Sequence, residues 1–422
     1  QESPPAMRVV ILGAGFAGLS AALELERSCG DTPGVEITLV DQHNYHLFQP
    51  LLYQVVTGGI EPGHISFPVR SLIRGKRIDF RESRATGIDL RGKTVATDDG
   101  DLPWDRLVIA LGSTTNYFGL AGEEGGALPL KTLGDSVAIH NRLVDSYEAA
   151  LLEGDGRRRR RLLSFVVVGG GATGVELAAS IQDFVRKVMP RDYPTIPAGE
   201  VRVFLLEARG AIIAGMDPKL QDVALKRLGS MGVEVMLDTP VAGFGPEGVQ
   251  TAGGLSIPSH TVVWVAGVKP VSLVEGLPLD RAPDGRILVD RNLEVPGQEG
   301  VYIAGDCAYL LQEGRGQGRT GPFPPTGQIA VRQGLACAQN IARDLRGEPR
   351  QPLRYRYRGE LISMGRNAAV AQVGGWAFDG LAAWLLWRIY YLGKLTGFRN
   401  KLSVALDWSF AYFYRRNTAR LG

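Results

Sequence analysis

Cysteine is scarce in this chain and follows no pattern. Only three cysteines occur in 422 residues, Cys29, Cys307 and Cys337, and they lie far apart without a CxxC motif. A disulfide framework, a zinc site and a redox dithiol are therefore unsupported, and free thiols suit a reducing compartment. Because His43 and His46 have no Cys or carboxylate partner at ligand spacing, we expect no metal site.

Long apolar runs are also lacking. The most apolar segments, 381–392 and 403–414, would be about 18 Å long as helices, whereas a spanning helix must cover about 30 Å. Neither is expected to span a membrane. The first residues, QESPPAM, contain no basic segment followed by an apolar one, so we expect no signal peptide. The length suits two or three domains.

Charge is unevenly distributed. Five consecutive arginines, Arg157–Arg161, suggest nucleic acid at first sight, but no aromatic residues are interleaved with them. A solvated loop before a strand is favoured, with no nucleic-acid partner. Residues 380–422 contain seven Lys or Arg and one acid, Asp407, so this segment has a net charge of +6. Because the whole chain has a net charge of +3, the remaining residues carry a net charge of −3.

A glycine loop stands between a predicted strand and a predicted helix. Residues 9–12 form an apolar run typical of a buried parallel strand, and residues 19–26 have helical spacing. The motif between them, GAGFAG at 13–18, allows a tight turn, the close approach of a pyrophosphate and close helix packing. The free N–H groups of the helix N-terminus then favour the phosphate.

Acidic residues follow the neighbouring strands. The strand predicted at 35–40 ends in Asp41, 28 residues after Gly13 where about 20 is usual, and its carboxylate can accept hydrogen bonds from a ribose. Residues 107–112 predict a further strand of the same sheet. Another, at 300–306, ends in Asp306, which is either an acidic turn residue or an acceptor for a ribityl chain.

The same pattern starts again at residue 165. A strand at 165–168 is followed by the loop GGGATG at 169–174 and a helix, and the strand at 201–206 ends in Glu207. Two such units suggest one for a flavin and one for a nicotinamide nucleotide. Glu207 should accept ribose hydroxyls and repel a 2′-phosphate, which favours NADH over NADPH, although Arg209 could soften that preference.

The C-terminal segment combines aromatic and basic residues at two short apolar helices. Aromatic rings at headgroup depth and Lys or Arg beside anionic lipid are typical of helices lying in a membrane interface. The alternative is an ordinary helical hairpin packed on a core or on a dimer partner. We expect residues 376–422 to contact a lipid bilayer.

Taken together, the motifs resemble the type II NADH dehydrogenases, which are single-chain, non-proton-pumping NADH:quinone oxidoreductases of the respiratory chain. The resemblance rests on the glycine loops and on YHLFQPLLYQ at 45–54, ALGS at 110–113, VVGGGATGVELA at 167–178, WVAGV at 264–268, AGDCA at 304–308, PPTGQIAVRQG at 324–334, GRNAAVAQVGG at 365–375 and GFRNKLSVALDWSFAYFYRR at 397–416.

The resemblance implies an α/β flavoprotein with two Rossmann-like dinucleotide-binding domains and a C-terminal amphipathic-helical membrane-binding region. It places an FAD domain at 1–118 and 285–355, an NADH domain at 119–284 and the membrane region at 356–422. FAD would bind non-covalently, and electrons would pass from NADH through FAD to a menaquinone or ubiquinone. The protein would be peripheral, facing the cytoplasm on a bacterial inner membrane or its equivalent, and a homodimer is allowed.

The implied site residues fall into two sets, and no metal ligands are expected. The FAD set is Gly13, Gly15, Phe16, Ala17, Gly18, Asp41, Gln42, Gln49, Leu51, Ala110, Gly112, Asp306 and Gln328. The NADH set is Gly169, Gly171, Ala172, Thr173, Gly174, Glu176, Glu207, Ala266 and Gly267.

Three residues are implied in catalysis: Glu176, Gln328 and Arg332. From its position alone, Glu176 could equally well compensate the dipole of its helix. The family's quinone segment reads AQxAxQ; here its first Gln is kept as Gln328 and its second is replaced by Arg332. Arginine can still donate to a quinone carbonyl.

Two competing functions remain. A sulfide:quinone reductase, or another NAD(P)H-dependent flavoprotein reductase, would share the architecture, and the former needs redox cysteines, for which Cys307 and Cys337 are the candidates. A non-catalytic, membrane-docked redox sensor would show flavin reduction without quinone turnover.

Overall fold

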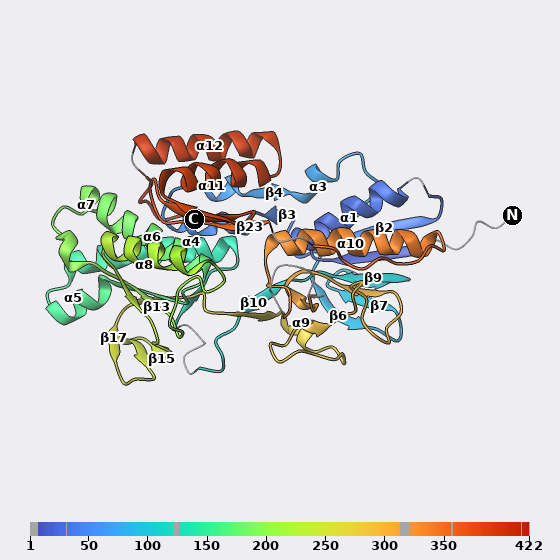
Figure 1. Ribbon diagram of the computed structural model, residues 1–422, viewed down its shortest axis with the longest axis horizontal. Coiled ribbons are helices and arrows are strands. Elements are labelled where there is room, and N and C mark those ends of the chain that lie inside the picture. The colour runs from blue at the N-terminus through green and yellow to red at the C-terminus, as the bar shows by residue number, and fades with distance from the viewer. Residues whose placement is uncertain are drawn as a thin grey trace. The chain divides into compact units, whose positions relative to one another are not determined.

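The computed structural model describes residues 7–30, 32–120, 126–312, 321–355, 358–414 and 416–421 (Figure 1). The chain divides into two compact units. Unit 1 comprises Gln1–His46, Phe67–Thr114 and Lys269–Arg356, and unit 2 comprises Leu47–Ser66, Thr115–Val268 and Tyr357–Gly422. Arg415, part of the basic tail, and QESPPA at the N-terminus lie outside the described residues.

Unit 1 is built on a parallel sheet in the order β21-β9-β1-β2-β5. Side chains of its central strand alternate between two cores: Val9 and Ile11 lie in the core beside helices α1 and α10, and Val10 and Leu12 lie in the core that contains Trp104. Helices α1 and α10 lie side by side (Figure 1). The bounds are β1 (Met7–Leu12), α1 (Phe16–Cys29), β2 (Val35–Asp41), β5 (Asp79–Glu82), β9 (Arg106–Ile109), β21 (Val301–Ile303) and α10 (Gly327–Leu345).

These bounds confirm the strands predicted at 9–12, 35–40 and 107–112, the last of which pairs in parallel with β1. Residues 85–103 of unit 1 add a three-stranded antiparallel sheet in the order β6-β7-β8. The remaining elements of unit 1 are α3 (Val69–Leu72), β6 (Ala85–Asp89), β7 (Thr94–Thr97), β8 (Gly100–Pro103), α9 (Ser272–Glu275), β20 (Ile287–Leu288), η4 (Gly305–Cys307) and β22 (Ala308–Tyr309).

Unit 2 repeats the plan with a second parallel sheet, ordered β11-β18-β12-β13-β14. Its strands are β11 (Leu128–Pro129), β12 (Ser164–Val168), β13 (Arg202–Leu206), β14 (Val233–Met236) and β18 (Thr261–Trp264), with a small antiparallel sheet of β15 (Val241–Gly245), β16 (Gly248–Thr251) and β17 (Ser256–Pro258). Its other elements before residue 357 are η1 (Gln49–Leu51), α2 (Leu52–Val56), η2 (Pro62–His64), α4 (Leu133–Leu152), α6 (Ala172–Lys187), α7 (Met189–Asp192), η3 (Ala198–Glu200) and α8 (Pro218–Met231). Four short strands contain a unit boundary: β3 (Tyr45–Leu47), β4 (Ser66–Pro68), β10 (Ser113–Thr115) and β19 (Val268–Pro270).

The arginine run was predicted as a loop, and that prediction is wrong: it forms helix α5 (Gly156–Leu162). Asp155 starts the helix, because its Oδ1 accepts hydrogen bonds from the backbone N–H groups of Arg157 and Arg158. Arginine is also a good helix former. The Arg159 side chain forms a salt bridge with Glu200, so this arginine is not only solvated, as the loop prediction had assumed.

The C-terminal part of unit 2 is a small antiparallel sheet followed by two helices. Its elements are β23 (Gly359–Ser363), β24 (Ala369–Val373), β25 (Trp376–Asp379), α11 (Gly380–Lys394) and α12 (Phe398–Phe413). The two helices confirm the predicted pair and lie side by side (Figure 1). Trp387 and Trp408 turn inward and are buried. None of the described helices combines the length and the apolar character that crossing a bilayer would need.

Candidate functional site

The glycine loop of unit 1 contains glycines of two kinds. Gly13 has a φ of +97°, and a Cβ added there would lie 2.4 Å from the carbonyl oxygen of Ala110. A Cβ at Gly18 would lie 1.8 Å from the oxygen of Gly13. The fold itself therefore requires these two glycines. A Cβ at Gly15, in contrast, would meet no atom within 4 Å, so the protein leaves space beside this loop.

Asp41 and His46 hold this loop from two sides. One carboxylate oxygen of Asp41 accepts the N–H of Ala14 at 2.6 Å and the other accepts the N–H of His43 at 2.8 Å. Burial raises the pKa of Asp41, and these hydrogen bonds offset only part of that rise. His46 Nδ1 lies 2.9 Å from the carbonyl oxygen of Ala14, which can only accept, so this nitrogen carries the proton. Burial lowers the pKa of His46, which makes it a neutral structural residue.

Asp306 lies in η4 and is fixed by residues that were not predicted. Its carboxylate accepts the hydroxyl proton of Ser113 at 2.6 Å. The neighbouring Gly305 donates its N–H to the buried Gln333 Oε1 at 2.7 Å. Ser113 completes the ALGS motif and Gln333 directly follows Arg332, so both stood next to residues that had been singled out.

The start of α10 meets the start of α1 in unit 1. A Cβ added at Gly327 would lie 3.2 Å from the ring of Phe16, and one at Gly334 would lie 2.1 Å from the carbonyl oxygen of Ala17. Gln328 is in the first turn of α10, and Arg332 is exposed in the second. Unit 1 contains every predicted FAD residue except Gln49 and Leu51, which belong to unit 2. Of the predicted residues in unit 1, Gln42 has an exposed side chain and Gly112 has a backbone φ of +74°.

The glycine loop of unit 2 has the same construction. A Cβ at Gly169 would lie 2.6 Å from the Cα of Ala266, and one at Gly174 would lie 1.8 Å from the oxygen of Gly169. At Gly171 there is again no atom within 4 Å. Two other predicted residues, Ala172 and Thr173, form the first turn of α6, and Gly267 faces the ring of Phe118, which would lie 2.6 Å from a Cβ there.

Glu207 takes the place in unit 2 that Asp41 has in unit 1. Its Oε2 accepts the N–H of Gly170 at 2.6 Å, and its Oε1 accepts the N–H of Arg209 at 2.9 Å. In both units, therefore, a carboxylate at the end of the second strand is attached to the glycine loop itself. Each carboxylate is held beside the loop's open space.

Glu176 is buried one turn into α6, against the C-terminal part of the chain. Its Oε1 accepts the backbone N–H of Ser363 at 3.0 Å and the indole N–H of Trp387 at 3.3 Å. Burial nevertheless raises the pKa of this carboxyl to about 8. A group of this pKa exchanges a proton near neutral pH, which an exposed carboxylate compensating a helix dipole would not do.

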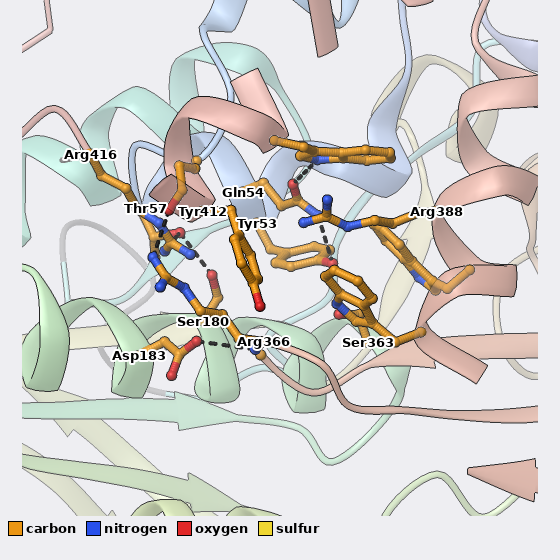
Figure 2. A pocket seen from close by; sticks show the side chains of 16 residues that line it. Tyr53, Gln54, Thr57, Ser180, Asp183, Ser363, Arg366, Arg388, Tyr412 and Arg416 are labelled. Atoms are coloured by element: carbon orange, nitrogen blue, oxygen red, sulfur yellow. Dashed lines mark hydrogen bonds between the residues drawn. The ribbon is translucent and has the colours of Figure 1, made fainter. Parts of the chain in front are cut away.

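The two partners of the Glu176 carboxyl, Ser363 and Trp387, line a pocket. Figure 2 shows Ser363 there together with Tyr53 and Arg388. The Arg388 guanidinium lies 3.9 Å from the ring centre of Trp384 and 5.0 Å from that of Trp408. Burial lowers the pKa of Arg388 to about 10. The pocket thus joins aromatic faces to cationic donors.

Comparison with known proteins agrees with this geometry. Residues 7–334 match the family model described as pyridine nucleotide-disulphide oxidoreductase, and residues 357–417 match the NDH2 C-terminal domain. The type II NADH:quinone oxidoreductase NdhA of Mycobacterium tuberculosis is 34% identical over 97% of this chain and 87% of its own.

Two solved structures share the fold. NDH2 from Plasmodium falciparum in complex with NADH has a TM-score of 0.88 at 18% identity, over 98% of this chain and 99% of its own. The sulfide:quinone oxidoreductase of Aquifex aeolicus has a TM-score of 0.72 at 19% identity, over 98% of this chain and 92% of its own.

Proposed function

The chain belongs to the type II NADH:quinone oxidoreductases, and from this premise we propose that it transfers two electrons from NADH through FAD to a membrane quinone. The observation that supports this most strongly is the doubled glycine loop. In each unit the central glycine, Gly15 or Gly171, borders open space that a pyrophosphate would fill. Bound FAD supplies the redox chemistry, which no side chain here provides.

We assign FAD to unit 1 and NADH to unit 2. In unit 1, Gly15 gives the pyrophosphate access, Asp41 accepts from the ribose, and Asp306, held by Ser113, accepts from the ribityl chain. In unit 2, Gly171 and Glu207 do the same for NADH. The domain boundaries given above stay a prediction, as do the assignments of Gln49, Leu51, Ala266 and Gly267.

For the acceptor we propose that Gln328 and Arg332 donate to quinone carbonyls. Glu176 is proposed to hold and release a proton, because quinone reduction consumes protons and its pKa of about 8 suits transfer near neutral pH.

We further propose that the protein is peripheral on the membrane, with residues 376–422 on the lipid and the body on the cytoplasmic side, from which NADH arrives. Large apolar side chains on α11 and α12 support this: Leu385, Ile389, Phe398, Leu402 and Phe410 are exposed at intervals typical of one helix face. A homodimer stays a prediction.

Buried thiols argue against the sulfide:quinone alternative. Cys29, Cys307 and Cys337 are all buried, and none of them forms a disulfide. The Sγ of Cys307 lies 2.9 Å from the carbonyl oxygen of Gly112, and burial raises the pKa of the Cys337 thiol. Reactive cysteines are accessible and have a lowered pKa, so neither thiol suits sulfide chemistry.

The function is tested by identifying the bound flavin and measuring turnover. We expect the purified protein to release FAD on denaturation and to couple NADH oxidation to the reduction of a short-chain quinone. Reduction of the bound flavin by NADH without turnover of the quinone would leave the redox sensor as the better assignment.

We expect Gly171→Ala to leave folding intact and to raise the KM for NADH at least tenfold, about 1.4 kcal/mol of lost binding. The added methyl group meets no protein atom, so the nucleotide is the group it obstructs. The matched variant Gly15→Ala should reduce FAD content instead. Thermal unfolding and initial rates measure both effects; an unchanged KM in a folded Gly171→Ala protein would refute the placement of NADH.

Glu207→Gln is expected to raise the ratio of kcat/KM for NADPH over NADH about tenfold. Glutamine can still accept from Gly170, but it no longer repels a 2′-phosphate. FAD content serves as the control and should not change. If the ratio does not move, Glu207 does not face the ribose.

A further inference from the structure

A second pocket, of about 250 Å³, lies in unit 2 beside the C-terminal end of α12. The ends of α6 and α7 contribute Lys187 and Arg191, and the turn between β23 and β24 contributes Arg366. The C-terminal segment contributes Arg416 and the aromatic residues 412–414. Among the described residues, four cationic side chains therefore line one space, together with a single carboxylate, that of Asp192.

The negative charge available inside the protein does not balance this group. Asp183 is engaged by Lys187 at 2.6 Å, and Asp192 accepts the hydroxyl proton of Thr418 at 2.8 Å. No carboxylate in the described part of the chain forms a salt bridge with Arg191, Arg366 or Arg416. Arginines that converge on one space and are not paired with carboxylates are typical of phosphate sites.

Arg416 shows the shortage of hydrogen-bond acceptors most clearly. Its side chain is partly buried, its buried Nε has no hydrogen-bond partner among the described residues, and its Nη1 lies 3.5 Å from the hydroxyl oxygen of Thr57 (Figure 2). Burying an arginine with so few partners is costly, because most of its five donors lose water without gaining an acceptor. An anion entering from the neighbouring pocket would supply the missing acceptors.

The pocket also adjoins the apolar face of α12. Phe413 and Tyr414, which line it, are 77% and 67% exposed, and Phe398, Leu402, Leu406 and Phe410 continue the exposed apolar face along the helix. A ligand with a phosphate at one end and long apolar chains at the other would satisfy both features.

We propose that this pocket binds the phosphate of an anionic phospholipid, whose acyl chains lie along the exposed face of α12. The inference rests on the proposed membrane contact of that face. Arg191, Arg366 and Arg416 hold the phosphate, and Arg366 also fixes the helix end, because its Nη2 donates to the carbonyl oxygen of Ala411 at 2.6 Å. Lipid recognition by a built pocket adds headgroup selectivity to the general attraction of a basic tail.

Vesicle flotation of the FAD-loaded protein tests the proposal. The wild type should bind phosphatidylglycerol vesicles more tightly than phosphatidylcholine vesicles. Arg191→Gln and, separately, Arg416→Gln should each lower the affinity for phosphatidylglycerol by about 10- to 100-fold and leave that for phosphatidylcholine unchanged. The matched control Arg399→Gln, which removes an exposed cation at the start of α12 outside the pocket, should lower this affinity about fivefold or less.

Calorimetry with soluble ligands separates the sources of phosphate. Dihexanoylphosphatidylglycerol below its micelle concentration should bind one per chain, and more tightly than inorganic phosphate. Equal affinity for the two, or pocket variants no weaker than Arg399→Gln, overturns the proposal. If the protein floats equally well with both kinds of vesicle, the phosphate-binding pocket is overturned but the membrane contact is kept. If the protein binds the short lipid but does not float with vesicles, only the membrane contact is overturned.

Discussion

Binding to lipid vesicles is expected to fall by about 10² to 10⁴-fold when Ile389 and Phe398 are both replaced by glutamate. These side chains are 69% and 82% exposed on α11 and α12, and burying each in lipid contributes about 1.5–3 kcal/mol. Flotation of the variant with phosphatidylcholine vesicles measures the loss. Reduction of the bound flavin by NADH in solution should not change, since neither side chain is part of the dinucleotide loops.

The control is Leu152→Glu, at the end of α4, where an equally apolar side chain is 91% exposed. We expect this variant to float as the wild type does, because α4 is not part of the proposed lipid face. If the double variant also floats as the wild type does, the membrane contact lies elsewhere on the chain. Deletion of residues 380–422 would be a poorer test, because it would also remove Trp387 from Glu176.

The second large effect concerns Glu176 and the pH dependence of stability. Burial raises its pKa from the ordinary value of 4.5 to about 8, so between these values the folded protein keeps a proton that the unfolded chain releases. The contribution of Glu176 to stability therefore falls as pH rises, by at most about 1.4 kcal/mol per pH unit and about 5 kcal/mol in total. Below pH 4.5 and above pH 8 it is constant.

Glu176→Gln removes this dependence. Relative to the wild type, the variant should become more stable as pH rises from 5 to 8, and the difference should then level off. Thermal unfolding across this range measures it. Trp387→Phe is the companion variant, because it deletes an N–H that favours the ionised carboxylate of Glu176. The pKa of Glu176 should then rise further, and the pH range over which stability falls should extend above pH 8. A difference between wild type and Glu176→Gln that is flat with pH would show that Glu176 is ionised when folded.

The local part of both dinucleotide sites could be predicted from the sequence. Strand, glycine loop and helix are adjacent in the chain, and β2 and β13 end at Asp41 and Glu207, as their apolar patterns predict. The steric need for glycine at Gly13 and Gly18 follows from the same turn. The carboxylates were expected to face a ribose; that they also bind the loop's own N–H groups could not be read from spacing.

The partners of Glu176 could not be predicted, because they are remote in sequence. Ser363 and Trp387 lie 187 and 211 residues away, and only the packing of the C-terminal sheet and α11 onto α6 brings them to it. The tail was predicted from its outer surface, as an aromatic and basic membrane segment. Its inner surface, which buries Trp387 and brings the indole N–H to Glu176, has no signature in composition.

Anaerobic stopped-flow on the flavin absorbance tests the central claim most directly. NADH is mixed with the oxidised protein first, and a short-chain quinone is then mixed with the reduced protein, with NADPH and sulfide as parallel donors. We predict rapid bleaching by NADH, slower bleaching by NADPH, none by sulfide, and rapid recovery with quinone. Bleaching by NADH without recovery would contradict the account, since the chain would then bind both dinucleotides and still not be a quinone reductase.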